Sequence, residues 1–176
     1  DLVKSFEFIL TFESMPRRIF YIVACLLLSA CATQPEVKNL PPQQTEIRLF
    51  KVEQLERQNQ VKQTSLLTVQ FAPRQWRWVQ TDSLGAPTAR LLLTYKGWEN
   101  DGFIMPNKQA QQVFSALATA LSPADPIFEF SSVNETKNGR IYQINHKTVW
   151  TIQQKPPQYH ISLPDESEWQ IEELSQ

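Results

Sequence analysis

Apolar and polar residues alternate along most of the chain after residue 45, which is the pattern of strands with one buried face. The segments QTSLLTVQF, QWRWVQ and ARLLLTY carry this alternation most clearly. Their apolar faces hold Leu67, Val69, Phe71, Trp76, Trp78, Leu91, Leu93 and Tyr95. Leu92 is apolar on the opposite face, so the alternation of the third segment is imperfect. Turn formers between segments, at intervals of roughly ten residues, are typical of an antiparallel meander.

Further strand candidates flank these segments. TEIRLFKVEQL precedes them and predicts a strand from about Glu46 to Leu55, and the later candidates are IFEFSSV, RIYQINH, KTVWTIQQ, QYHISLP and EWQIEEL. Asn138-Gly139 is a favourable turn dipeptide between two of them. The stretch from Trp98 to Met105 predicts either a short strand or a loop.

The period changes over PNKQAQQVFSALATAL, residues 106–121. Its apolar residues recur at spacings of three and four, as one face of a helix requires; they are Ala110, Val113, Phe114, Leu117 and Leu121. Pro106 fits at or just before the first turn, where its missing N–H costs nothing. Pro123 and Pro126 prevent continuation. This segment therefore predicts one amphipathic helix.

These patterns together predict a mainly β (α+β) domain over residues 46–176. About eight or nine strands with one amphipathic helix favour a half-open antiparallel β-barrel, with the helix packed on its concave side. The preceding residues 31–45 include ATQPEVKNLPPQQT, which is polar, contains prolines and lacks periodicity. We interpret this segment as a tether.

The front of the chain has the parts of a secretory signal peptide. Met15 is followed by Pro16-Arg17-Arg18 and by the apolar run Ile19 to Leu28, which is shorter than the roughly 20 residues of a membrane span. We interpret residues 15–30 as this signal peptide and residues 1–14 as an over-extended start. An alternative is a buried N-terminal helix that carries two free cysteines.

The residues LSAC, which end in Cys31, resemble the lipobox of bacterial lipoproteins. The resemblance implies that Cys31 is diacylated and becomes the new N-terminus, which anchors the protein to a membrane without spanning it. Such lipoproteins are held at the inner membrane by an aspartate at the next position, where this chain has Ala32. We therefore expect the periplasmic face of the outer membrane. Because Cys25 leaves with the signal peptide, no free thiol remains for chemistry.

The residue inventory argues against an enzyme. Catalysis needs a nucleophile, a base and a group that orients the base, and the chain has only 2 histidines. With 4 glycines it also lacks a glycine-rich phosphate loop. The formal net charge is -1, and no basic block indicates nucleic acid. We expect no catalytic residues, no metal or other cofactor and no nucleic-acid partner.

The aromatic residues allow two interpretations, and the sequence leaves both open. Rings most often fill a core, but a small barrel can also enclose an apolar cavity for a ligand. The aromatic set is Phe71, Trp76, Trp78, Tyr95, Phe103, Phe114, Phe128, Phe130, Tyr142, Trp150 and Tyr159. The candidates to line a cavity are Leu67, Val69, Trp76, Trp78, Leu91, Leu93, Phe114, Leu117 and Trp150.

The loop TDSLGAP, residues 81–87, places Leu84 among turn-forming residues. An apolar side chain at a loop tip either folds back into the core or meets something apolar outside. Burying one leucine contributes only about 1.5 to 3 kcal/mol. An outward Leu84 could therefore tune a membrane contact, but it could not anchor the protein.

From Ser65 onward, SLLTVQFAPRQWRWVQTDSLGAPTARLLLTYKGWENDGF resembles a family of uncharacterised bacterial lipoproteins often encoded beside aryl-polyene or fatty-acid-type biosynthesis genes. That family is similar to the outer-membrane lipoprotein receptor LolB. The shared pattern is an aromatic-Arg strand, Thr81, a turn pair, Leu84-Gly85 and a second apolar strand. Further on, NGRIYQINHKTVWTIQQ and PPQYHISLPDESEWQIEEL are similar to its closing hairpins. Ser83 departs from the proline that LolB usually has before the leucine.

The resemblance implies a half-open barrel covered by helix, an apolar cavity for acyl chains, and a membrane-contact loop at Leu84 and Gly85. It implies a hydrophobic cargo, such as an acyl chain, a polyene lipid or a lipoprotein, and a periplasmic carrier protein as a further partner. We expect a monomer. The alternative hypothesis is a structural lipoprotein with a filled core that acts as a scaffold in a cell-envelope assembly.

Overall fold

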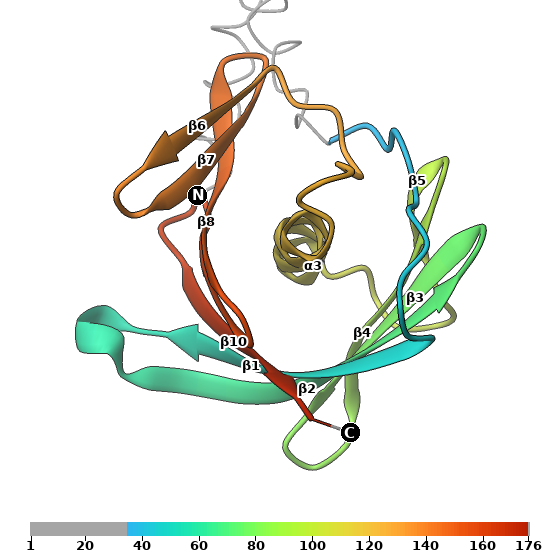
Figure 1. Cartoon of the computed structure of the whole chain (residues 1–176). Helices are drawn as coiled ribbons and strands as arrows, with labels where there is room; N and C mark the ends of the chain where they lie inside the picture. The colour runs from blue at the N-terminus through green and yellow to red at the C-terminus, as the bar shows by residue number, and fades with distance from the viewer. Residues whose placement is uncertain (1–34, 176) are drawn as a thin grey trace, which may run out of the picture. The chain divides into compact units, whose positions relative to one another are not determined.

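The structure is a computed structural model that describes residues 35–175 (Figure 1). Cys31 and the expected signal peptide lie outside the described residues. The described residues belong to one compact unit, which begins at Pro35.

The unit is mainly β, with a single α-helix among the described residues. The strands are β1 Ile47–Leu55, β2 Val61–Ala72, β3 Gln75–Asp82, β4 Pro87–Thr94, β5 Gly97–Asn100, β6 Ser132–Thr136, β7 Gly139–Ile144, β8 Lys147–Lys155, β9 Gln158–Ser162 and β10 Glu168–Leu174. A 3-10 turn, η1, covers Arg57–Asn59, and the helix α3 covers Lys108–Leu121.

All the strands form one antiparallel sheet in the order β5-β4-β3-β2-β1-β10-β9-β8-β7-β6. The predicted antiparallel, mainly β fold is thus confirmed, but the sheet has 10 strands instead of eight or nine. The sheet also does not close into a barrel, because the short strands β5 and β6 lie at its two edges without pairing with each other. The sheet curves around α3 instead (Figure 1).

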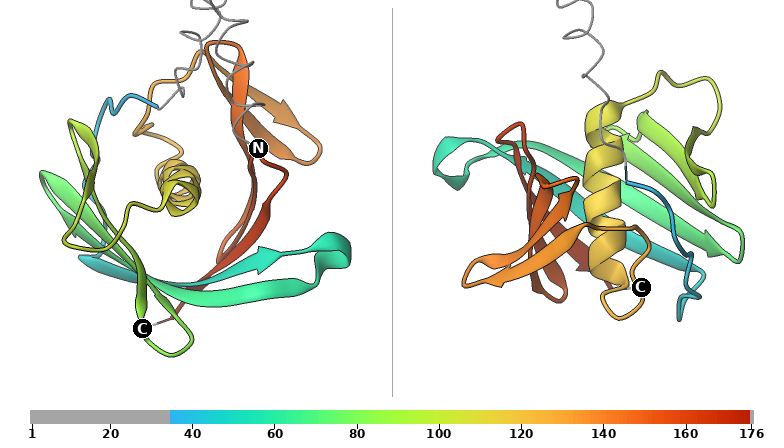
Figure 2. Two further views of the ribbon diagram at one scale, coloured as in Figure 1. Left: turned by 180° about the vertical axis from the view of Figure 1, so that it is seen from behind. Right: turned by 90° about the horizontal axis from the view of Figure 1, so that it is seen from above.

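The helix begins and ends close to its predicted limits. The side chain of Asn107 caps the first turn by accepting a hydrogen bond from the Ala110 N–H at 3.0 Å. The helix ends at Leu121, just before Ser122 and Pro123. It lies along the concave side of the sheet (Figure 2), as predicted.

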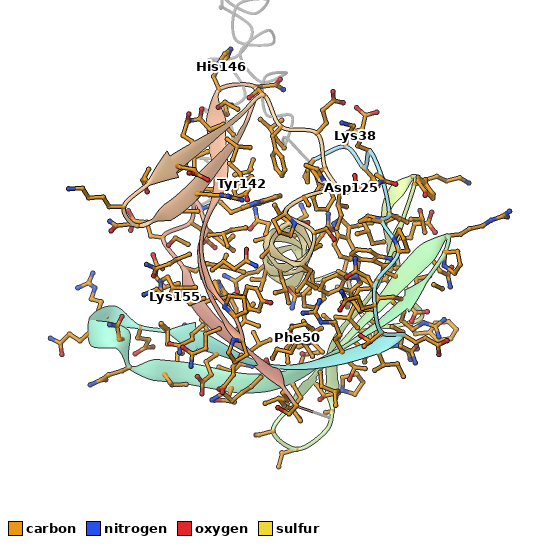
Figure 3. All side chains as sticks on the ribbon, in the orientation of Figure 1. Lys38, Phe50, Asp125, Tyr142, His146 and Lys155 are labelled. Carbon is orange, nitrogen blue, oxygen red and sulfur yellow. The ribbon has the colours of Figure 1, made fainter. Side chains whose placement is uncertain are left out.

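Side chains fill the space between α3 and the sheet (Figure 3). Phe50 points from β1 into this space and is fully buried. Most of the helix is buried as well, with small side chains on much of its surface: Ala110, Ser115, Ala116, Ala118, Thr119 and Ala120. These small residues let the sheet approach the helix closely on several sides.

Two local predictions are wrong. IFEFSSV does not form a strand over 127–133, because Ile127 and Phe128 are consecutive and both buried, which a strand with one buried face does not permit. The strand of this region, β6, begins only at Ser132. Tyr95 does not share the buried face of β4, because the strand ends at Thr94 and the tyrosine ring is exposed in the turn.

Residues 36–39 run antiparallel to residues 127–129. Val37 forms an isolated bridge with Phe128, the Lys38 N–H donates to the Ile127 carbonyl at 2.7 Å, and the Glu129 N–H donates to the Glu36 carbonyl at 3.0 Å. Leu40 is buried in the core. Of the expected tether 31–45, residues 35–45 therefore belong to the folded unit, which begins earlier than the predicted Glu46.

Candidate functional site

The structure brings the nine cavity candidates together around α3. All of them are buried, at 4% exposure or less, and all belong to one hydrophobic cluster: Leu67, Val69, Trp76, Trp78, Leu91, Leu93, Phe114, Leu117 and Trp150. They come from strands on both sides of the helix and from the helix itself. The period-two and helical patterns therefore selected residues that share one interior.

On the β3 side, aromatic rings connect the sheet directly to the helix. The Trp78 ring stacks on Phe114 with 5.3 Å between centroids, and Trp98 meets the edge of Trp78 at 5.6 Å. The Trp98 indole Nε1–H donates to Ser115 Oγ at 2.8 Å. Stacked and edge-to-face pairs of this kind each add about 0.5 to 1.5 kcal/mol beyond the area that they bury.

A second aromatic group lies on the β7 and β8 side. Phe130 contacts Tyr142 at 4.9 Å and Trp150 at 5.8 Å between centroids, and Phe128 contacts Trp150 at 6.1 Å. Phe128 and Phe130 come from the segment after α3 that was predicted as a strand. The adjacent apolar residues Ile127 and Phe128 are both buried. Two apolar residues in succession indicate a segment that is buried on more than one side.

Two indole N–H donors in this interior are unpaired. Within residues 35–175, Trp78 Nε1 and Trp150 Nε1 are buried and have no hydrogen-bond partner. Their rings are 0% and 2% exposed. Buried donors are almost always paired, and an unpaired one costs about 1 to 3 kcal/mol. Each indole could donate to an acceptor that enters the interior.

Side chains fill the interior in this structure. Of the two interpretations that the sequence left open, a filled core and an apolar cavity, this conformation has the filled core. Surface clefts of about 310 to 680 Å³ are present, but their linings include none of the nine candidates. A ligand that used the nine residues would have to displace α3 from the sheet.

Polar contacts near both ends of α3 hold the helix in place. At its start, Gln109 Nε2 donates to Asp165 Oδ2 at 3.1 Å, and just after its end Ser122 Oγ accepts from Gln43 Nε2 at 3.1 Å. Partial burial acts to raise the pKa of the Asp165 carboxyl, but hydrogen bonds from Ser167, the backbone and Gln109 outweigh it and hold that pKa below its ordinary value.

The predicted membrane-contact residues lie at the tip of the β3–β4 hairpin. Leu84 is 92% exposed, so its side chain does not fold back into the core. Asp82 Oδ1 accepts hydrogen bonds from the N–H groups of Leu84 and Ala86, both at 2.9 Å. Gly85 has a φ of 85°, a conformation that favours glycine and completes the tight turn.

Two members of the aromatic set, Tyr95 and Phe103, neither fill the core nor line an interior cavity. The side chain of Phe103 is fully exposed in the loop between β5 and α3. Met105 in the same loop is also exposed. The sequence does hold a signal for an exposed loop here, because the apolar residues 103–105 lie between Gly102 and Pro106 and follow neither a strand period nor a helix period.

Comparison with known proteins adds no family assignment, since no family model and no curated protein matches this sequence. Among the described residues, no helix has the length and apolar character needed to cross a membrane.

Proposed function

We propose that this chain is a lipid-anchored lipoprotein on the periplasmic face of the outer membrane. It has no enzymatic activity, and it binds or transfers a hydrophobic cargo. The cargo is an acyl chain, a polyene lipid or a lipoprotein, received from a periplasmic carrier protein. The anchor is the acylated Cys31, and the lipobox-like LSAC supports it.

The observation that carries this proposal is the pair of unpaired indole donors inside a mostly apolar interior. Trp78 and Trp150 face the interior from β3 and β8, on the two flanks of the curved sheet. An apolar chain with a carboxylate or ester group would match both the apolar surface and one such donor. A core that serves only for packing gains nothing from two unpaired N–H groups.

The cargo takes the place of the helix side chains against the sheet. In this mechanism α3 moves away, and the acyl chain replaces Phe114 and Leu117 on the surface of β3 and β4. Such a movement breaks the contacts at the ends of α3. The Gln109–Asp165 bond is exposed, so water can replace it, whereas the Gln43–Ser122 bond is partly buried. Leu84 and Gly85 touch the membrane during release.

The resemblance to LolB supports the same function. The curved antiparallel sheet around one helix and the exposed leucine at a hairpin tip support this part of the proposal. The remaining LolB-like features, namely an opened cavity and a carrier partner, are part of this proposal.

One observation favours the second candidate function, a scaffold in an envelope assembly. The nine interior candidates are buried at 4% exposure or less in one hydrophobic cluster. A scaffold would keep this packing and would take up no ligand.

A binding experiment separates the two functions. The mature lipoprotein, purified in detergent, is extracted for mass spectrometry and titrated with a fluorescent fatty acid. Reproducible acyl or polyene species and saturable uptake support cargo binding, whereas an empty protein without uptake refutes it.

Matched tryptophan variants test the donor. Trp78→Phe keeps the ring and removes the N–H, so we expect fatty-acid affinity to fall about five- to tenfold, the value of one hydrogen bond. Trp76→Phe is the control, because Trp76 is also buried on β3 but is not among the unpaired indoles. Equal affinities of the two variants would rule out a role for the Trp78 donor.

A further inference from the structure

The loop between β5 and α3, residues 101–107, exposes two large apolar side chains. Phe103 is 109% exposed and Met105 is 84% exposed, relative to the reference values for their residue types. Neither side chain contributes to the hydrophobic core cluster. Isolated apolar residues on a surface are ordinary, but two at one loop tip need a partner that removes them from water.

This loop leaves the sheet at the same end as the Leu84 hairpin. β4 begins at Pro87 beside the hairpin, and Leu91 pairs with Asn100, the last residue of β5. The Asp101 N–H then donates to the Arg90 carbonyl at 3.0 Å. We call this end of the sheet the Leu84 rim, which also holds the N-terminal end of α3 (Figure 2).

Side chains at the base of the two tips pair some of the backbone groups of each tip. Asn100 Nδ2 donates to the carbonyls of Gly102 and Ile104, both at 2.9 Å. In the hairpin, Asp82 accepts from Leu84 N–H as described above. Backbone groups without partners make entry into a lipid phase costly. These internal bonds therefore lower the cost of inserting the two tips.

The Asp101 carboxylate at the base of the loop lies against two arginines. Asp101 Oδ2 accepts a hydrogen bond from Arg90 Nη2 at 3.2 Å and forms an ion pair with Arg77, whose Nε lies 3.1 Å away. These groups belong to neighbouring strands and lie below the apolar tips. A lipid surface can thus approach without leaving the Asp101 carboxylate unpaired.

The chain also enters the folded unit from this rim. Neighbouring strands of the sheet run in opposite directions, so β7, like β3, ends at the Leu84 rim. Ser132, at the start of β6, pairs with Gln143 near the end of β7 and therefore lies at the same rim. Residues 127–131 lead toward that end, so the antiparallel residues 36–39 run away from it. The Pro35 end is therefore the end nearer the rim.

We infer that Phe103 and Met105 form, with Leu84, a two-loop surface that enters the interfacial layer of a phospholipid membrane. This inference rests on the proposed lipid anchor, because Cys31 lies only four residues before Pro35. Such a length spans at most about 14 Å. The anchor thus holds the Leu84 rim against the bilayer. Exposed apolar side chains at protruding loop tips fit a fluid lipid surface, into which single side chains can enter.

Depth-dependent fluorescence quenching tests this surface. The mature lipoprotein is reconstituted, through the acyl chains on Cys31, into vesicles of phosphatidylethanolamine and phosphatidylglycerol. Phe103→Cys and Leu84→Cys are each labelled with a polarity-sensitive fluorophore, and nitroxide lipids in the vesicle quench it. Tyr95→Cys is the control, because Tyr95 is an exposed aromatic residue at the opposite end of β4. The unsubstituted protein must take up no label.

We expect a blue-shifted emission and severalfold stronger quenching at positions 103 and 84 than at position 95. Equal quenching at 103 and 95 would overturn the inference, and so would protection of position 103 only after a periplasmic protein extract is added. Failure of the proposed cargo function gives a different result, namely no fatty-acid uptake while quenching at 103 persists. Label uptake by the unsubstituted protein, together with no palmitate incorporation, refutes the anchor and with it the inference.

Discussion

Replacing Phe114 by alanine tests whether α3 is packed into the interior as the structure has it. Phe114 is fully buried and stacks on Trp78 at 5.3 Å. Removing a buried phenylalanine costs about 3 to 5 kcal/mol, and loss of the stacked pair adds about 0.5 to 1.5 kcal/mol. We therefore expect Phe114→Ala to lower the free energy of unfolding by at least about 3 kcal/mol.

The assay is urea unfolding of residues 35–176, the compact unit that holds the whole described core, followed by tryptophan fluorescence. A loss of this size lowers the melting temperature by about 10 °C for a domain of this length. Phe103→Ala is the matched control, because the same atoms are removed from a fully exposed position. Its effect should stay within about 0.5 kcal/mol.

Similar stabilities of the two variants would refute the packing described here. They would show that α3 does not hold its place on the sheet in solution, and that the interior is open without any movement. A large loss for Phe114→Ala together with increased fatty-acid uptake would instead agree with a cargo that replaces helix side chains.

Two further substitutions test other parts of the fold and of the helix contacts. Gly139→Ala should destabilise the unit by more than about 1 kcal/mol in urea unfolding, because Gly139 has a φ of 114° and an added Cβ would lie 2.3 Å from the Ile152 carbonyl oxygen; wild-type stability would contradict this geometry. Asp165→Asn should make the free energy of unfolding less dependent on pH at acid pH. The folded protein holds the pKa of Asp165 below its ordinary value near 4, so the ionised carboxylate stabilises the fold above that pH. This stabilisation is lost as the pH falls through the pKa of Asp165 in the folded protein. Unfolding measured from pH 7 to pH 3 checks this, and a pH dependence as steep as that of the wild type would count against the Asp165 contacts.

The sequence located the strands wherever one face is buried and the other exposed, because period-two alternation is a local property. It likewise located the helix, since the three- and four-residue spacing of apolar residues and the prolines Pro106, Pro123 and Pro126 mark it in the sequence itself. It failed at Tyr95, which lies in the turn after β4 ends at Thr94, and at Ile127-Phe128, where burial depends on a partner far along the chain. Phe128 is covered in part by Val37, a contact that no local pattern encodes.

The sequence by itself determined which residues are apolar and on which face of each element they lie, and this was sufficient to select the nine residues of the interior. Only the tertiary structure decided whether that interior is filled, because the contact between Trp78 and Phe114 depends on how closely α3 approaches β3. It also decided that Leu84 points outward and that Phe103 joins it at one rim. The length and register of β4 and β5 set the end of the sheet at which the chain leaves β5, and residue patterns alone do not fix that register.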